Sequence, residues 1–205
     1  MTNLTRLLAA VAILGCGACG APASDHDADP ESSFLSATLT ASSLQPPPQS
    51  ADMNPKIAYD PCTMIPDGVV RKAGYNPATR NRYSGAPHSS VVIFGCDFVD
   101  DSNSAINPQS ELKVASSNDS LNENRNSRTD PAYKHEPVVA VNVNGREGFQ
   151  ASDAPEYGTC YVYFATKAGT VTVIRRTTPT THDYDPCAGM LDLAKLIEPT
   201  VGANN

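Results

Sequence analysis

The sequence has no tryptophan, and aromatic residues make up only 6% of its 205 residues. It also lacks any run of lysine and arginine, and its formal net charge is −7. Because nucleic-acid binding needs clustered positive charge to neutralise phosphates, this composition argues against a nucleic-acid partner. The sequence contains no Gly-x-Ser-x-Gly, no His-Glu-x-x-His and no phosphate-binding loop. We therefore predict a protein that is not an enzyme and has no cofactor.

Near the start of the chain there is no apolar run long enough for a permanent membrane span. The run Leu7–Leu14 has eight residues, whereas a membrane-spanning helix needs roughly 20. Its length instead fits a signal peptide, and it leads into Ile13-Leu14-Gly15-Cys16, which resembles a bacterial lipobox. We predict a signal peptide over residues 1–15 and lipid on Cys16, which would anchor the chain at the extracytoplasmic face of the cell membrane.

Two alternatives to this prediction remain open. The leader can be an ordinary secretory peptide that is cleaved without lipidation. Cys19, which follows Ala18, is a rival acylation site, although a cysteine at its −3 position fits a lipobox poorly. If Cys16 carries the lipid, Cys19 is left as a free thiol.

Composition divides the rest of the chain into a tether, a domain and a short tail. Residues 16–56 are poor in large apolar residues and rich in Ala, Ser, Asp and Pro, which predicts a disordered tether. Residues 57–201 contain the apolar runs of one folded domain, and residues 202–205 form the tail.

Four cysteines lie in the predicted domain: Cys62, Cys96, Cys160 and Cys187. Their spacing contains no Cys-x-x-Cys pair, so we expect no metal site and, in an oxidising compartment, two disulfides. Three connectivities are open. The tripeptide Asp-Pro-Cys occurs at both ends of the domain, whereas the middle two cysteines lie in predicted strands. If the two Asp-Pro-Cys cysteines pair with each other and the two strand cysteines pair with each other, the bridges are Cys62–Cys187 and Cys96–Cys160, and we favour this pairing.

The pattern of apolar residues predicts an α+β domain, in which an antiparallel sheet of about five strands has N- and C-terminal helices packed on one face. Gly95 is expected to form a bulge in its strand. Residues 116–130 are polar and predict a mobile loop. Helices are expected over 61–65, 66–74 and 186–198, and strands over 90–99, 111–115, 138–143, 160–165 and 170–174.

The order of these motifs resembles a family of actinobacterial lipoproteins that includes the mycobacterial LprB and LprC. The resemblance spans about residues 57–201 and implies an envelope location and a shared domain without an assigned activity. The family often has Trp two residues after the Gly-Cys cysteine, where this chain has Phe98. The matching positions are Asp60, Pro61, Cys62, Gly95, Cys96, Cys160, Asp185, Pro186 and Cys187.

Two functions are compatible with these observations. The first is a non-enzymatic interaction module that binds an envelope protein or a cell-wall component through the open face of the sheet. The alternative is a carrier or sensor that holds a small apolar ligand between the sheet and the helices. Tyr161 and Tyr163, which share one face of a predicted strand, are our candidates for the wall of such a pocket. The interaction module predicts an exposed apolar patch.

Overall fold

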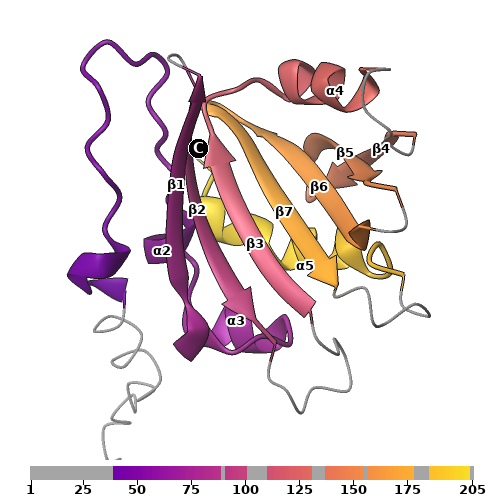
Figure 1. The fold of residues 1–205 in the computed structure, drawn as a ribbon, viewed down its shortest axis with the longest axis horizontal. Helices are drawn as coiled ribbons and strands as arrows, with labels where there is room; N and C mark the ends of the chain where they lie inside the picture. Colours follow the sequence, from indigo (N-terminus) through magenta and orange to yellow (C-terminus); the bar gives the residue numbers. More distant parts are fainter. Residues whose placement is uncertain are drawn as a thin grey trace, which may run out of the picture.

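The computed structural model describes residues 39–88, 91–100, 110–130, 137–154, 157–177 and 185–203, and of residues 86–88 the backbone alone. Figure 1 shows a twisted sheet with helices behind it. In chain order the elements are η1 (Ser42–Leu44), α2 (Pro61–Met64), α3 (Asp67–Lys72), η2 (Pro77–Thr79), β1 (Asn81–His88), β2 (Val91–Val99), β3 (Ser110–Ser117), α4 (Leu121–Thr129), β4 (Val139–Val143), β5 (Arg146–Ser152), β6 (Thr159–Thr166), β7 (Gly169–Thr177), α5 (Met190–Ile197) and η4 (Glu198–Val201).

The sheet has seven strands in the order β1-β2-β3-β7-β6-β5-β4, and every neighbouring pair is antiparallel. The predicted α+β class is confirmed, but the predicted number of five strands is wrong. The two missed strands are β1 and β5, whose only large apolar residues are Tyr83 and Phe149 respectively. Each becomes a strand because it pairs with a more apolar neighbour, and local composition does not reveal that pairing.

The two faces of the sheet have different surroundings. The face that we call the helix face packs against α2, α3 and α5, and its core includes Phe98, Val114, Val162 and Val173. On the opposite face, which we call the outer face, α4 packs over β5 and β6. No helix of the described residues is long and apolar enough to cross a membrane.

A local signal in the sequence places the start of α2 but not the start of α5. Pro61 is the first residue of α2, and the Asp60 carboxylate accepts a hydrogen bond from the Cys62 amide at 3.2 Å. We had predicted that the second Asp-Pro-Cys starts the last helix, but it does not. Residues 186–189 form turns, and α5 starts at Met190 because Gly189 adopts a left-handed conformation (φ 70°).

The disulfides join Cys62 to Cys96 and Cys160 to Cys187, so the predicted pairing is wrong. Each bridge ties a helical or turn segment to a strand, with Cα–Cα distances of 4.9 and 5.2 Å. Cys96 and Cys160 cannot pair because β3 and β7 lie between their strands. Three strand spacings separate them by about 14 Å, about twice the distance that a disulfide can span.

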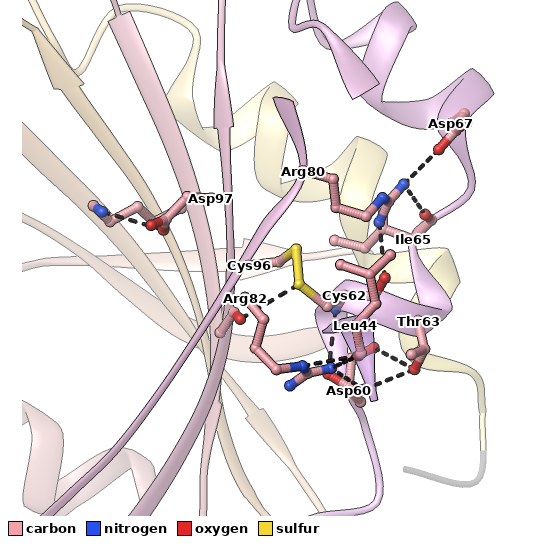
Figure 2. The surroundings of a disulfide bond; sticks show 12 residues. Leu44, Asp60, Cys62, Thr63, Ile65, Asp67, Arg80, Arg82, Cys96 and Asp97 are labelled. Carbon is pink, nitrogen blue, oxygen red and sulfur yellow. Dashed lines mark hydrogen bonds and ion pairs between the residues drawn. A yellow bond between two sulfur atoms is a disulfide. The ribbon is translucent and has the colours of Figure 1, made fainter. Parts of the chain in front are cut away.

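A buried ion pair lies beside the Cys62–Cys96 bridge, as Figure 2 shows. Arg82 of β1 forms an ion pair with Asp60 at 2.5 Å, and each side chain is 9% exposed. Arg82 also donates from Nε to the Leu44 carbonyl at 2.8 Å. Nearby, Arg80 binds Asp67 at 2.6 Å and donates to the Cys62 and Ile65 carbonyls. These contacts hold α2, α3 and the segment before them against β1.

Part of the predicted tether is folded. Leu44 is 6% exposed and belongs to the core cluster of the helix face. The Gln49 side chain donates to the Ile57 carbonyl and accepts from the Ile57 amide, both at 2.8 Å. The folded part therefore starts before residue 57, the boundary that composition predicted.

Candidate binding surface

The tyrosines that we had predicted to line a pocket, Tyr161 and Tyr163, lie on the outer face of β6. Since side chains alternate along a strand, the intervening Val162 points instead to the core of the helix face. Tyr163 is buried against Phe149 and Leu121, with Tyr161 packed at the edge of this cluster. Neither tyrosine can line a space between the sheet and helices α2, α3 and α5.

Arg128 of α4 covers the two tyrosines and connects their hydroxyl groups. Its guanidinium carbon lies 3.7 Å from the centroid of the Tyr161 ring, and its Nε donates to the Tyr163 hydroxyl at 2.8 Å. It also forms an ion pair with Asp153 at 2.7 Å, and Asp153 accepts a hydrogen bond from the Tyr161 hydroxyl at 2.6 Å. The four side chains form a connected polar network, which attaches α4 to the sheet.

The helix that carries Arg128 lies within residues 116–130, which we had predicted to be a loop. Ser120 and Glu123 form a capping box, in which each side chain bonds the backbone amide of the other. This motif could have been found in the sequence. We missed the helix because it has almost no apolar face: Leu121 is its only buried residue, and arginine–aromatic contacts replace the usual apolar packing.

Burial raises the pKa of Tyr163 to about 12, and the nearby Arg128 charge opposes this rise only in part. A folded-state pKa above the unfolded value of about 10 contributes stability that is complete below pH 10 and is lost as the pH rises towards 12. Tyr163→Phe should be less stable than the wild type by about 1 kcal/mol at pH 8, because it lacks one hydrogen bond. It should then lose less stability than the wild type between pH 10 and 12.

Urea unfolding at pH 8, 10 and 11.5 tests this prediction. Tyr157→Phe, at an exposed position, controls for the substitution itself. Equal losses of stability in Tyr163→Phe and the wild type over this range would show that ionisation of Tyr163 is not linked to folding.

No described helix covers the part of the outer face formed by β1, β2, β3 and β7 (Figure 1). Tyr83 of β1 lies opposite Gly95 of β2, and its ring lies over that glycine. A Cβ at position 95 would be 2.0 Å from Tyr83 Cζ. The glycine thus makes room for the ring and does not form the bulge that we had predicted, since β2 pairs with β3 continuously from Ile93 to Val99.

Next to Tyr83, Lys113 joins two carboxylates. Its Nζ lies 3.1 Å from Asp97 and 2.9 Å from Glu111, and it lies 5.4 Å from the centroid of the Tyr83 ring. Burial lowers the pKa of Lys113, but its hydrogen bonds to Glu111 and Asp97 outweigh this effect and raise the pKa above its ordinary value. Burial raises the pKa of Asp97, and Lys113 opposes that rise. This cluster places charged donors and acceptors beside an aromatic ring.

A hollow of about 610 Å³ lies at one end of the sheet. Its lining is more polar than apolar, and neither Tyr161 nor Tyr163 belongs to it. This lining does not suit a small apolar ligand. The hollow is lined by Asn54, Pro55, Val91, Asn118, Asp119, Ser120, Leu121, Glu123, Ala165, Thr166, Lys167 and Gly169.

Ser110 and Lys113 have the spacing of a Ser-x-x-Lys motif, but a strand places them on opposite faces of the sheet. The Ser110 hydroxyl is buried against the Tyr75 hydroxyl at 3.1 Å.

Within the described ranges, no group of three or more His, Cys, Asp or Glu residues is placed to hold a metal ion. The predicted lipidation site Cys16, and also Cys19, lie outside the described residues.

A family model described as a protein of unknown function, DUF3558, matches residues 11–200. The chain belongs to the DUF3558 family. Cys16 and the four disulfide-bonded cysteines all lie within the match. No curated protein and no solved structure matches this DUF3558 chain.

Proposed function

We propose that this DUF3558 protein is a lipoprotein of the LprB and LprC type, anchored by lipid on Cys16 at the extracytoplasmic face of the cell membrane. Its domain is a non-enzymatic module that binds cell-wall glycan through the outer face of the sheet. The Ile13-Leu14-Gly15-Cys16 motif supports the anchor, and the family match begins at residue 11, before this motif. The two disulfides suit an oxidising compartment outside the cytoplasm.

The proposal of a binding role rests on the Tyr83 ring, which lies over Gly95 on a part of the sheet that no described helix covers. The Tyr83 ring is half-buried over Gly95, and its exposed part can stack on the apolar face of a sugar. Lys113, Asp97 and Glu111 lie beside it, and such charged groups form strong hydrogen bonds to hydroxyl groups.

The charged cluster of Lys113, Asp97 and Glu111 on this face favours a glycan over a protein that docks through apolar contacts. An interface with a protein that docks through apolar contacts has a contiguous apolar core. The large apolar side chains that are exposed in the described residues lie on separate elements and form no such core. They are Met64, Val99, Val139 and Tyr157.

Sedimentation of the full chain, in detergent, with purified insoluble cell wall tests this function. Lys113→Ala should weaken binding about tenfold, because a charge-assisted hydrogen bond contributes about 1.5 kcal/mol or more. Lys72→Ala is the matched control, since it removes an exposed lysine from α3 on the other side of the sheet. Failure of the wild type to sediment with cell wall, or equal weakening by both substitutions, would overturn the proposal.

A further inference from the structure

The two edge strands of the sheet differ in how well they are protected from pairing with another chain. β1 contains Arg82 and Pro87, and its register with β2 shifts between Gly85 and His88. Charged residues, proline and irregular register are common means by which proteins block an exposed sheet edge. In addition, Arg82 donates a hydrogen bond to the Leu44 carbonyl beside this edge.

β4, at the other edge, has none of these features. Its sequence, Val139-Ala-Val-Asn-Val143, contains no charge and no proline, and its register with β5 is continuous. Val139 is 58% exposed, and Ala140 and Asn142 are also exposed. An uncharged, regular and exposed edge of this kind is suited to pairing with a further strand.

The turn after β4 determines which peptide groups are available for pairing. Asn144 and Gly145 both have positive φ (50° and 97°), as in a two-residue type I′ turn. Val143 and Arg146, which flank this turn, therefore form a hydrogen-bonded pair, and hydrogen-bonded and non-hydrogen-bonded pairs alternate from there. It follows that the backbone N–H and C=O groups of Ala140 and Asn142 point away from β5.

We propose that β4 pairs antiparallel with β4 of a second copy of this chain, about a twofold axis at Val141. In this register Ala140 of each copy lies opposite Asn142 of the other, and each such pair exchanges two hydrogen bonds. The two seven-stranded sheets join into one continuous sheet. Because the strand is uncharged, two copies meet in this register without like charges on opposing residues.

The same register also determines which valines meet across the junction. Val139, Val141 and Val143 all point to the helix face, and opposite residues in an antiparallel pair share a face. Val139 of each copy therefore lies opposite Val143 of the other, which is already buried within its own chain. The two half-buried Val141 side chains meet at the axis.

Cross-linking at single cysteines tests the register in the full chain carrying Cys19→Ser. With a mild oxidant, Val141→Cys should give at least about five times as much disulfide-linked dimer as Val139→Cys, because only position 141 meets its own copy. Two residues at position 139 would lie about 14 Å apart. Accidental collisions would instead favour the more exposed position 139. More cross-linked dimer from Val139→Cys than from Val141→Cys, or no cross-link at either position, would overturn the proposal.

The mass of the full chain in detergent, measured by sedimentation, provides an independent test. Ala140→Asp/Asn142→Asp places two pairs of like charges at the junction and should weaken the dimer at least about tenfold. Ala140→Lys/Asn142→Asp changes the same two positions but places opposite charges across the junction, so it should stay dimeric. A monomeric wild type, or equal behaviour of the two double variants, would contradict the pairing.

Discussion

Arg82→Met should lower the free energy of unfolding by about 3–5 kcal/mol, because it leaves a buried carboxylate without its partner. The Asp60 side chain is 9% exposed, and Arg82 is the cation that pairs with it at 2.5 Å. The substitution also removes the hydrogen bond from Arg82 Nε to the Leu44 carbonyl, which ties Leu44 to β1. Denaturant unfolding at neutral pH measures this loss of stability.

Arg125→Met is the matched control for this experiment. The Arg125–Glu147 pair has side-chain exposures of 31% and 71%, and an exposed pair contributes about 1 kcal/mol or less. The double variant Asp60→Asn/Arg82→Met should lose less stability than the sum of its single substitutions, because no uncompensated charge remains. If Arg82→Met cost no more than Arg125→Met, the ion pair beside the disulfide would have no special role in stability.

Replacing both Cys62 and Cys96 by alanine should lower the free energy of unfolding by about 4 kcal/mol, the chain-entropy cost of reopening a loop of this size. The two cysteines are 34 residues apart in the sequence. Cys160→Ala/Cys187→Ala, with a separation of 27 residues, should cost nearly as much, about 3.5 kcal/mol. Denaturant unfolding under non-reducing conditions measures both losses.

The same variants also test the pairing of the cysteines. If Cys62 is bonded to Cys96, their joint replacement leaves the other bridge intact, and titration of the unfolded chain finds no more free thiols than in the wild type. The alternative pairing of Cys62 with Cys187 and Cys96 with Cys160 would break both bridges and release two thiols. That result would contradict the structure.

The sequence predicts local features of this domain better than long-range ones. Asp60-Pro61 specifies the start of α2 through bonds within a few residues. The same pair at Asp185-Pro186 failed to predict a helix start because Gly189 intervenes. The cysteine pairing depends on the order of the strands across the sheet, which no local pattern reveals.

The candidate site could be predicted only in part. The sequence places Tyr161 and Tyr163 on one face of a strand, as the structure does. It could not show that Arg128 covers them, because that contact depends on where α4 packs. Tyr83 and Lys113 are brought together by the register of β1, β2 and β3, so neither residue stands out in the sequence alone.

Mapping of backbone amide chemical shifts in the full chain, in detergent micelles, tests the proposed binding surface most directly. Soluble glycan fragments released from cell wall would be titrated into the protein. The account predicts that the largest shifts occur at Tyr83, Gly95 and Lys113 on the outer face, with little change in α5. Shifts confined to the hollow around Asn118 and Lys167, or no shifts at millimolar glycan, would contradict it.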